Sequence, residues 1–178
     1  MKKFITLLIA LCSVATMFAQ QYQPVDDKST VKFRIKNFGV GTGGEFKGLE
    51  GSIEFDKASP DKTVFDITID AAKVNTDNGS RDNHLRKEEY FNVAKYPKIS
   101  FKSDKVASKG NGFTVSGKLT IKGTTKNISF PFTAEAKEDG YLFNGSFEIN
   151  RRDFKVGGNS MVLGDNVTVT LSVFAKKK

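Results

Sequence analysis

The stretch "GFTVSGKLTIKGTTKNISFPF", from Gly112 to Phe132, alternates apolar and polar side chains almost without interruption. A β-strand sends successive side chains to opposite faces, so a period of two predicts strands rather than helices. The segment "KGTT" at 122–125 separates two alternating runs and predicts a turn. The stretch therefore predicts two strands, each with one apolar and one polar face.

The same alternation continues through most of the chain. Further turn signals are "SPDK" at 59–62, "KGNG" at 109–112 and "EDG" at 138–140. A sheet with one solvent-exposed face must bury the other, which predicts a sandwich or a closed barrel. Eight antiparallel strands suit a barrel that holds one small ligand. The predicted strands are roughly Val31–Asn37, Glu45–Phe55, Val64–Asp70, Lys98–Lys105, Gly112–Ile121, Asn127–Lys137, Tyr141–Arg151 and Asn166–Ala175.

The aromatic residues suggest two different interiors. The chain has 16 Phe, 4 Tyr and no Trp, and many Phe share the inward side of their strands. These side chains either pack a solid core or line an elongated apolar cavity, and the sequence leaves both open. The residues expected on a cavity wall are Phe33, Ile35, Phe46, Phe55, Ile67, Phe101, Phe113, Val115, Leu119, Phe130, Phe132, Phe143, Phe147, Ile149, Val169 and Leu171.

The N-terminal segment has the pattern of a secretory signal peptide. Lys2 and Lys3 precede an apolar run that ends near Ala19. We expect cleavage after Ala19, which gives a signal peptide at 1–19, a domain at 20–178 and a periplasmic or secreted protein. Cys12, the only cysteine, lies in this segment, so the remaining chain has no disulfide and no thiolate site. The context "IALC" is a weak lipoprotein signal, because Leu11 stands where a small residue is expected.

The charge of the chain is positive. Removal of Lys2 and Lys3 lowers the formal net charge from +8 to +6, and most of the remaining cations are scattered. This pattern favours a solvated surface, and it favours contact with anionic lipid over binding to nucleic acid. Transient contact with a membrane surface and formation of a homodimer are both left open.

Two motifs suggest enzyme chemistry but lack its context. Gly39, Gly41 and Gly44 have G-x-G-x-x-G spacing, yet a strand-like pattern follows them instead of the helix that a dinucleotide site needs. We interpret these glycines as a tight bend. A single histidine excludes a multi-histidine metal site, and no G-x-S-x-G elbow occurs. We therefore predict no catalytic residue, no metal site and no catalytic cofactor; the alternative is an enzyme that uses His84 and Asp82 on a small hydrophobic substrate.

The stretch "GSRDNHLRKEEYFNVAKYPKISF", from Gly79 to Phe101, breaks the alternation and resembles a motif of the YceI family of secreted bacterial proteins. The segments "GKLTIKGTTKNISFPF" at 117–132 and "INRRDFKVGG" at 149–158 agree with the same family. The residues that match the first motif are Arg81, Asp82, His84, Leu85, Phe91, Tyr96, Pro97, Ile99 and Phe101.

This resemblance implies an all-β fold, an eight-stranded antiparallel lipocalin-like barrel with a short helical insert around residues 80–91. It also implies that the barrel holds an amphiphilic ligand, an isoprenoid lipid or isoprenoid quinone, as a carrier or store. Some relatives take fatty-acid derivatives, which is a second alternative, and an unliganded structural barrel is a third. The family often has His where this chain has Asn37.

The insert and the strand ends predict a polar mouth. Asn78 or Ser80 can cap the helix, and Leu85 and Phe91 can pack it onto the barrel as a lid. Asn37 and Arg151 continue the inward series of their strands, and Asp82 and Asp153 are the expected partners of Arg151. The predicted mouth consists of Asn37, Asp82, His84, Arg151 and Asp153. Arg151 is either a structural ion pair or an anchor for a ligand head group.

Overall fold

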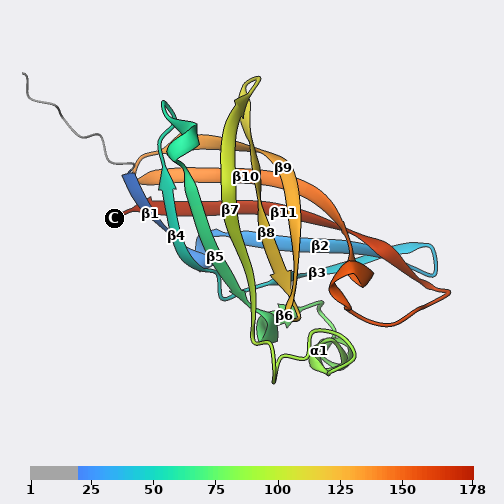
Figure 1. The fold of residues 1–178 in the computed structure, drawn as a ribbon. Helices are drawn as coiled ribbons and strands as arrows, with labels where there is room; N and C mark the ends of the chain where they lie inside the picture. The colour runs from blue at the N-terminus through green and yellow to red at the C-terminus, as the bar shows by residue number, and fades with distance from the viewer. Residues whose placement is uncertain (1–19) are drawn as a thin grey trace, which may run out of the picture.

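The alternating segments form one antiparallel sheet that curls into a barrel (Figure 1). The computed structural model describes residues 20–178, so the predicted signal peptide at 1–19, including Cys12, lies outside the described residues. The strands are β1 (Gln20–Pro24), β2 (Thr30–Asn37), β3 (Val40–Phe46), β4 (Glu50–Phe55), β5 (Val64–Asp70), β6 (Val74–Asn75), β7 (Lys98–Lys109), β8 (Gly112–Ile121), β9 (Thr124–Lys137), β10 (Gly140–Asn150) and β11 (Leu163–Lys177).

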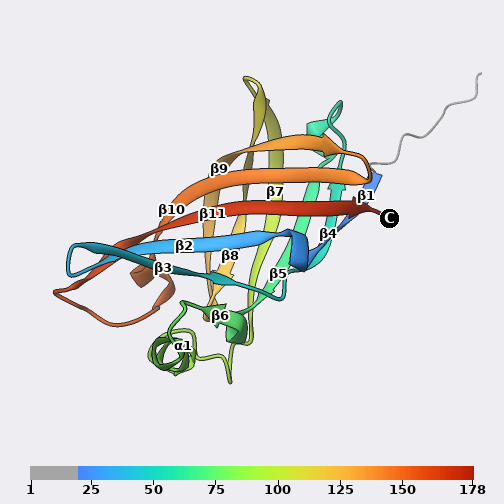
Figure 2. The same ribbon diagram turned by 180° about the vertical axis from the view of Figure 1, so that it is seen from behind.

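The ring closes through β1, which pairs with β4 on one side and with β11 on the other. The closed order is β1-β4-β5-β7-β8-β9-β10-β11, an eight-stranded antiparallel barrel, as predicted. Strand β11 is long enough to pair with β1 near its end, at Ala175, and with β2 along its middle, at Leu171. Strands β2, β3 and β6 therefore extend the sheet beyond the ring, and the β2–β3 hairpin projects to one side (Figure 2).

Two sequence predictions about β3 and β4 are wrong. The segment predicted as one strand, Glu45–Phe55, is two strands, because the chain turns at Gly48 with φ +78°. The Asp26 carboxylate holds the corner by accepting the N–H groups of Gly48 and Leu49, each at 2.9 Å. The glycines predicted as a bend lie mostly in β3, and only Gly39 sits in the turn.

The insert is a short helix followed by turns. Helix α1 (Gly79–Arg86) ends earlier than the predicted 80–91, and Asn78 caps it by accepting the Arg81 N–H at 3.0 Å. Leu85 and Phe91 pack against the barrel as predicted, and the Phe91 ring meets Phe46 edge-on at 5.3 Å. The insert thus covers one end of the barrel (Figure 1).

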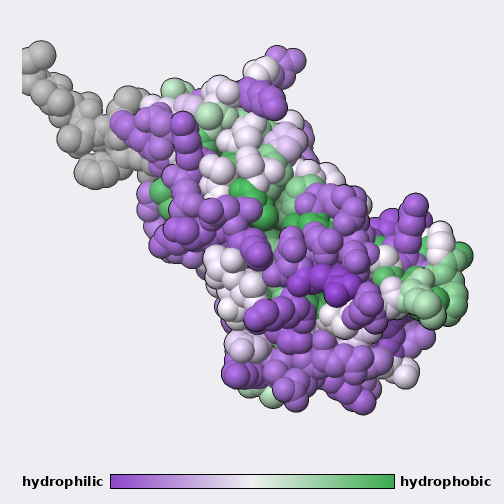
Figure 3. Space-filling view, turned by 45° about the vertical axis from the view of Figure 1, so that its right-hand side comes forward, coloured by the Kyte–Doolittle hydropathy of each residue, from purple (hydrophilic) through white to green (hydrophobic). Residues whose placement is uncertain are grey.

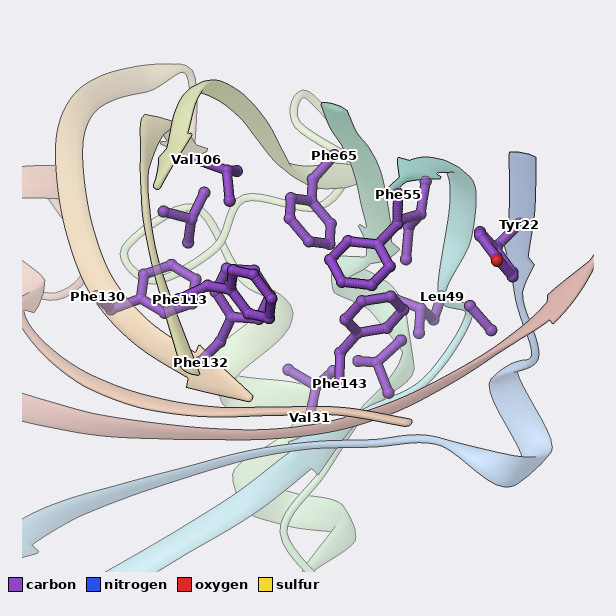
Figure 4. Packing of buried hydrophobic residues seen from close by; sticks show 14 residues of the cluster. Tyr22, Val31, Leu49, Phe55, Phe65, Val106, Phe113, Phe130, Phe132 and Phe143 are labelled. Atoms are coloured by element: carbon purple, nitrogen blue, oxygen red, sulfur yellow. The ribbon is translucent and has the colours of Figure 1, made fainter. Parts of the chain in front are cut away.

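The apolar interior falls into two clusters. One fills the end near β1 and β4 with aromatic rings, and Figure 4 shows Phe55, Phe65, Phe132 and Phe143 converging there. Phe55 packs edge-on against Phe143 at 5.2 Å, a favourable arrangement for aromatic pairs. The other cluster lies beneath the insert; its buried members are Phe46, Ala71, Val74, Ile99, Leu119, Ile121, Phe154 and Val156.

Candidate functional site

A cavity of about 580 Å³ lies inside the barrel and reaches residues of both clusters. Sites for small molecules usually measure about 300–1,000 Å³, so this cavity has the size of a ligand site. Its wall is almost wholly apolar and includes residues from nine strands, β2 to β5 and β7 to β11. Strand β9 contributes Ile128, Phe130 and Phe132.

The wall is distinguished from a packed core by its partial exposure. Phe33, Phe101 and Phe147 point into the cavity but are only half-buried, whereas Phe55 and Phe113 at the packed end are buried. Side chains of a close-packed core would be buried throughout. The two interiors that the sequence left open therefore coexist, with a packed core at one end and a cavity along the rest.

Fourteen of the sixteen predicted wall residues line this cavity. The two others, Phe55 and Phe113, point inward but lie in the packed end, where their rings meet edge-on at 5.5 Å. Alternation identifies the face of a strand and carries no information on depth along the barrel, which explains the difference. The role of the wall in ligand binding stays a prediction.

The mouth of the cavity lies between the β2–β3 turn, the segment 155–162 and α1. Asn37, Thr42, Arg81, His84 and Ser160 supply its polar groups. The exposed His84 has its Nε2 3.3 Å from Glu89 Oε1, and its ring packs edge-on against Tyr90 at 5.0 Å. Both contacts hold the imidazole against the segment that follows α1.

Asp82 and Asp153 do not line this mouth. Asp82 is buried, and its Oδ1 accepts the Thr76 N–H at 2.9 Å and the Thr76 hydroxyl at 2.6 Å. Asp153 is exposed on the 3-10 helix η4 (Arg151–Phe154). No hydrogen bond joins Asp82 to His84 within residues 20–178.

Arg151 reaches the cavity, but its predicted partners are wrong. The residue is 4% exposed, and its Nη2 lies 2.9 Å from Asp165 Oδ1. Its remaining bonds go to the carbonyl oxygens of Gly164, Val156, Gly158 and Leu163 at 2.9, 2.9, 3.0 and 3.4 Å. All five guanidinium N–H groups therefore have acceptors in the protein, which favours the structural interpretation.

The cation that faces the mouth is Arg81, a residue of the matched motif that was not predicted to be part of the site. Its Nε donates to the Thr76 hydroxyl at 2.9 Å, Nη2 to the Thr76 carbonyl at 2.9 Å, and Nη1 to the Thr42 hydroxyl at 3.3 Å. In the part of the chain that is described, Arg81 forms no ion pair. Strand parity could not reveal it, because it lies on the helix.

Lys122 forms hydrogen bonds with two segments near the mouth, the insert and the segment that follows η4. Its ammonium group donates to the carbonyl oxygens of Glu89 at 3.1 Å and Lys155 at 2.9 Å. Burial lowers the pKa of Lys122, and the negative charges of Glu88 and Glu89 and the Tyr96 side chain only partly oppose this effect. The insert and the segment after η4 are therefore tied together through the β8–β9 turn.

Two general features of the described residues bear on function. No helix among residues 20–178 has the length and apolar character needed to cross a membrane. Over the same range, no three His, Cys, Asp or Glu side chains gather into a group that could hold a metal ion.

Known proteins are similar to this chain in sequence and in fold. The model of the YceI-like domain matches residues 22–175. A UPF0312 protein of Yersinia enterocolitica is 35% identical over 142 residues, which cover 79% of this chain and 71% of that protein.

Three solved structures have the same architecture. BcnA of Burkholderia cenocepacia superposes with a TM-score of 0.82 at 28% identity, covering 86% of this chain and 99% of that one. The Campylobacter jejuni YceI protein superposes with a TM-score of 0.69 at 32% identity, and the match covers 76% of this chain and 84% of that one. A polyisoprenoid binding domain from Saccharophagus degradans superposes with a TM-score of 0.68 at 18% identity, and the match covers 91% of this chain and 100% of that one. The matched motifs, the closed barrel and these relatives agree: the chain belongs to the YceI-like family.

Proposed function

We propose that the protein binds an amphiphile with a long apolar tail, an isoprenoid lipid or isoprenoid quinone, and acts as its carrier or store. The observation that carries this proposal is the partial exposure of inward aromatic residues such as Phe101 and Phe147 around one large apolar cavity. An apolar tail gains about 0.8 kcal/mol for each CH₂ that it buries, so such a wall supplies affinity without polar contacts.

The polar groups of the mouth suit a small polar head. Arg81 has N–H groups beyond its three protein bonds, and Asn37 and His84 lie on the same rim. The family relationship and the name of the Saccharophagus degradans domain, a polyisoprenoid binding domain, support the same ligand class. These findings favour a binding protein over an enzyme.

The proposed location is the periplasm or the exterior of the cell. It rests on the basic and apolar pattern of residues 1–19. Expression of the full chain in a bacterial host, followed by N-terminal sequencing of the protein from the periplasm and the medium, tests it; an intact Met1 in the cytoplasm would contradict it.

The ligand is tested by extraction. The protein purified without detergent is extracted with organic solvent, and mass spectrometry should find a prenyl lipid or quinone near one molecule per chain. Val169→Trp, which fills the cavity, should lose this ligand. Thr168→Trp, one residue away on the outward face, is the matched control and should keep it. A fatty-acid derivative in the extract would replace the isoprenoid, and an extract without stoichiometric lipid would refute the proposal.

A further inference from the structure

The turn between β2 and β3 projects beyond the barrel and carries exposed apolar side chains. Phe38 is 75% exposed and Val40 is 70% exposed. The segment before β11 runs beside the turn, since the Phe38 N–H donates to the Val162 carbonyl at 2.9 Å, and the neighbouring Met161 is fully exposed. These four residues, Phe38, Val40, Met161 and Val162, form the apolar tip, and Figure 3 shows a hydrophobic patch at this projecting end.

The backbone at the tip is unusual for a residue as large as phenylalanine. Phe38 and Gly39 have φ values of +50° and +75°, the positive pair of a type I′ turn. The first position of such a turn favours Asn, and bulky residues rarely adopt a positive φ. Because the Phe38 side chain is mostly in solvent, burial within the chain does not compensate this strain, and a strained exposed residue points to a function.

The surroundings of the tip are basic. The segments 32–42 and 155–164 contain Lys32, Arg34, Lys36 and Lys155 but no Asp or Glu, while Glu148 and Asp165 line one surface pocket together with Arg34 and Lys36. None of the four basic side chains forms an ion pair within residues 20–178. Aromatic and aliphatic groups flanked by unpaired cations complement the surface of an anionic bilayer, where the apolar groups enter the head-group boundary and the cations meet phosphates.

The tip is continuous with the cavity, because Phe38 and Val162 also line its mouth. We propose that the apolar tip docks on an anionic lipid bilayer, with Phe38, Val40 and Met161 entering the interface, so that the mouth opens toward the membrane for ligand exchange. The docking itself stands on the tip alone; only the exchange step rests on the proposed function.

Flotation with vesicles tests the docking. Vesicles of phosphatidylcholine with phosphatidylglycerol should carry the wild-type protein upward in a density gradient, and pure phosphatidylcholine or high salt should weaken this binding. Phe38→Asn combined with Met161→Ser should reduce vesicle partitioning about tenfold or more. Asn is preferred at this turn position, so Phe38→Asn alone should raise the melting temperature while it weakens binding, which separates docking from folding.

The matched control is Val64→Ser, which changes an exposed apolar residue at the start of β5, away from the projecting tip, and should leave partitioning unchanged. Wild-type protein that stays unbound, or tip variants that bind as well as wild type, would overturn the proposal. A dimer that the tip substitutions convert to monomers, without vesicle binding, would show that a second copy covers the tip and would overturn it too.

A transfer measurement separates this proposal from the proposed ligand. Delipidated protein is mixed with phosphatidylglycerol-containing vesicles loaded with a short-chain ubiquinone. The tip variant for this measurement is Val40→Ser combined with Met161→Ser, because neither residue lines the cavity. It should take up ubiquinone about tenfold more slowly yet reach the same final content. Absence of uptake by wild type would count against the quinone as ligand, and flotation would still decide the docking. Equal uptake rates in wild type and tip variant would overturn the exchange step.

Discussion

Arg151 Nη2 lies 2.9 Å from Asp165 Oδ1, and this contact joins η4, which directly follows β10, to the start of β11. The same guanidinium binds carbonyl oxygens of the intervening segment, at Val156, Gly158 and Gly164. One buried side chain therefore holds the loop that forms one side of the cavity mouth.

Replacement of Arg151 should destabilise the protein strongly. Arg151→Met leaves several carbonyl oxygens without a donor, and we expect the free energy of unfolding to fall by about 3 kcal/mol in urea denaturation. Asp165→Asn should cost only about 1 kcal/mol, because the half-exposed amide oxygen still accepts a bond. Wild-type stability together with an altered ligand in Arg151→Met would instead support the head-group anchor.

Two phenylalanines of the same parity should behave differently. Phe113 lies in the packed end, so Phe113→Ala should lower the free energy of unfolding by about 3–5 kcal/mol, and the folded fraction should keep its ligand. Phe147 lines the cavity and is half-buried, so Phe147→Ala should cost less stability and change ligand affinity. Denaturation and extraction of both variants measure this contrast, and equal effects on both readouts would contradict it.

Asp26 should make stability depend on pH in the acid range. Desolvation of its carboxylate opposes ionisation, but the N–H groups of Leu49 and Gly48 and the charges of Lys47 and Lys73 outweigh it, and the pKa of Asp26 lies below its usual 3.8. A lowered folded-state pKa gives stability that is present above pH 3.8 and is lost as the pH falls through the folded value. Asp26→Asn should therefore lose stability at pH 7 and differ less from wild type at pH 2, by urea denaturation. A constant difference between pH 7 and pH 2 would count against this ionisation.

Arg81 should set the preference for a ligand head group. Arg81→Met removes the unpaired cation from the mouth, and competition between ligands with different head groups should show altered selectivity. The loss of stability should stay near 1 kcal/mol, because the side chain is exposed. Lys87→Met is the control and should keep the wild-type selectivity, since Lys87 is an exposed cation at the end of the same helix and does not line the cavity. Unchanged selectivity in Arg81→Met would remove this residue from the site.

Most strands, and the side of each strand that faces inward, could be predicted from the local pattern of residues. Val169 and Thr168 take opposite faces because the backbone of a strand imposes a period of two on any chain that adopts it. The helical insert could also be predicted, because the cap at Asn78 and the apolar Leu85 and Phe91 are local features of one short segment.

Three features depend on the tertiary structure: the position of an inward residue along the barrel, the closure of the ring of strands, and the ion-pair partner of Arg151. Phe113 and Phe147 share the inward side, yet only the arrangement of neighbouring strands places one in a packed core and the other on a cavity wall. Strand β1 closes the ring through pairing with β11, more than a hundred residues away, and its five residues are too few for a strand pattern to stand out. Arg151 met Asp165 instead of Asp82 or Asp153 because the chain folds back after η4. Such contacts depend on distances in space between segments, and a local pattern of side chains contains no information about them.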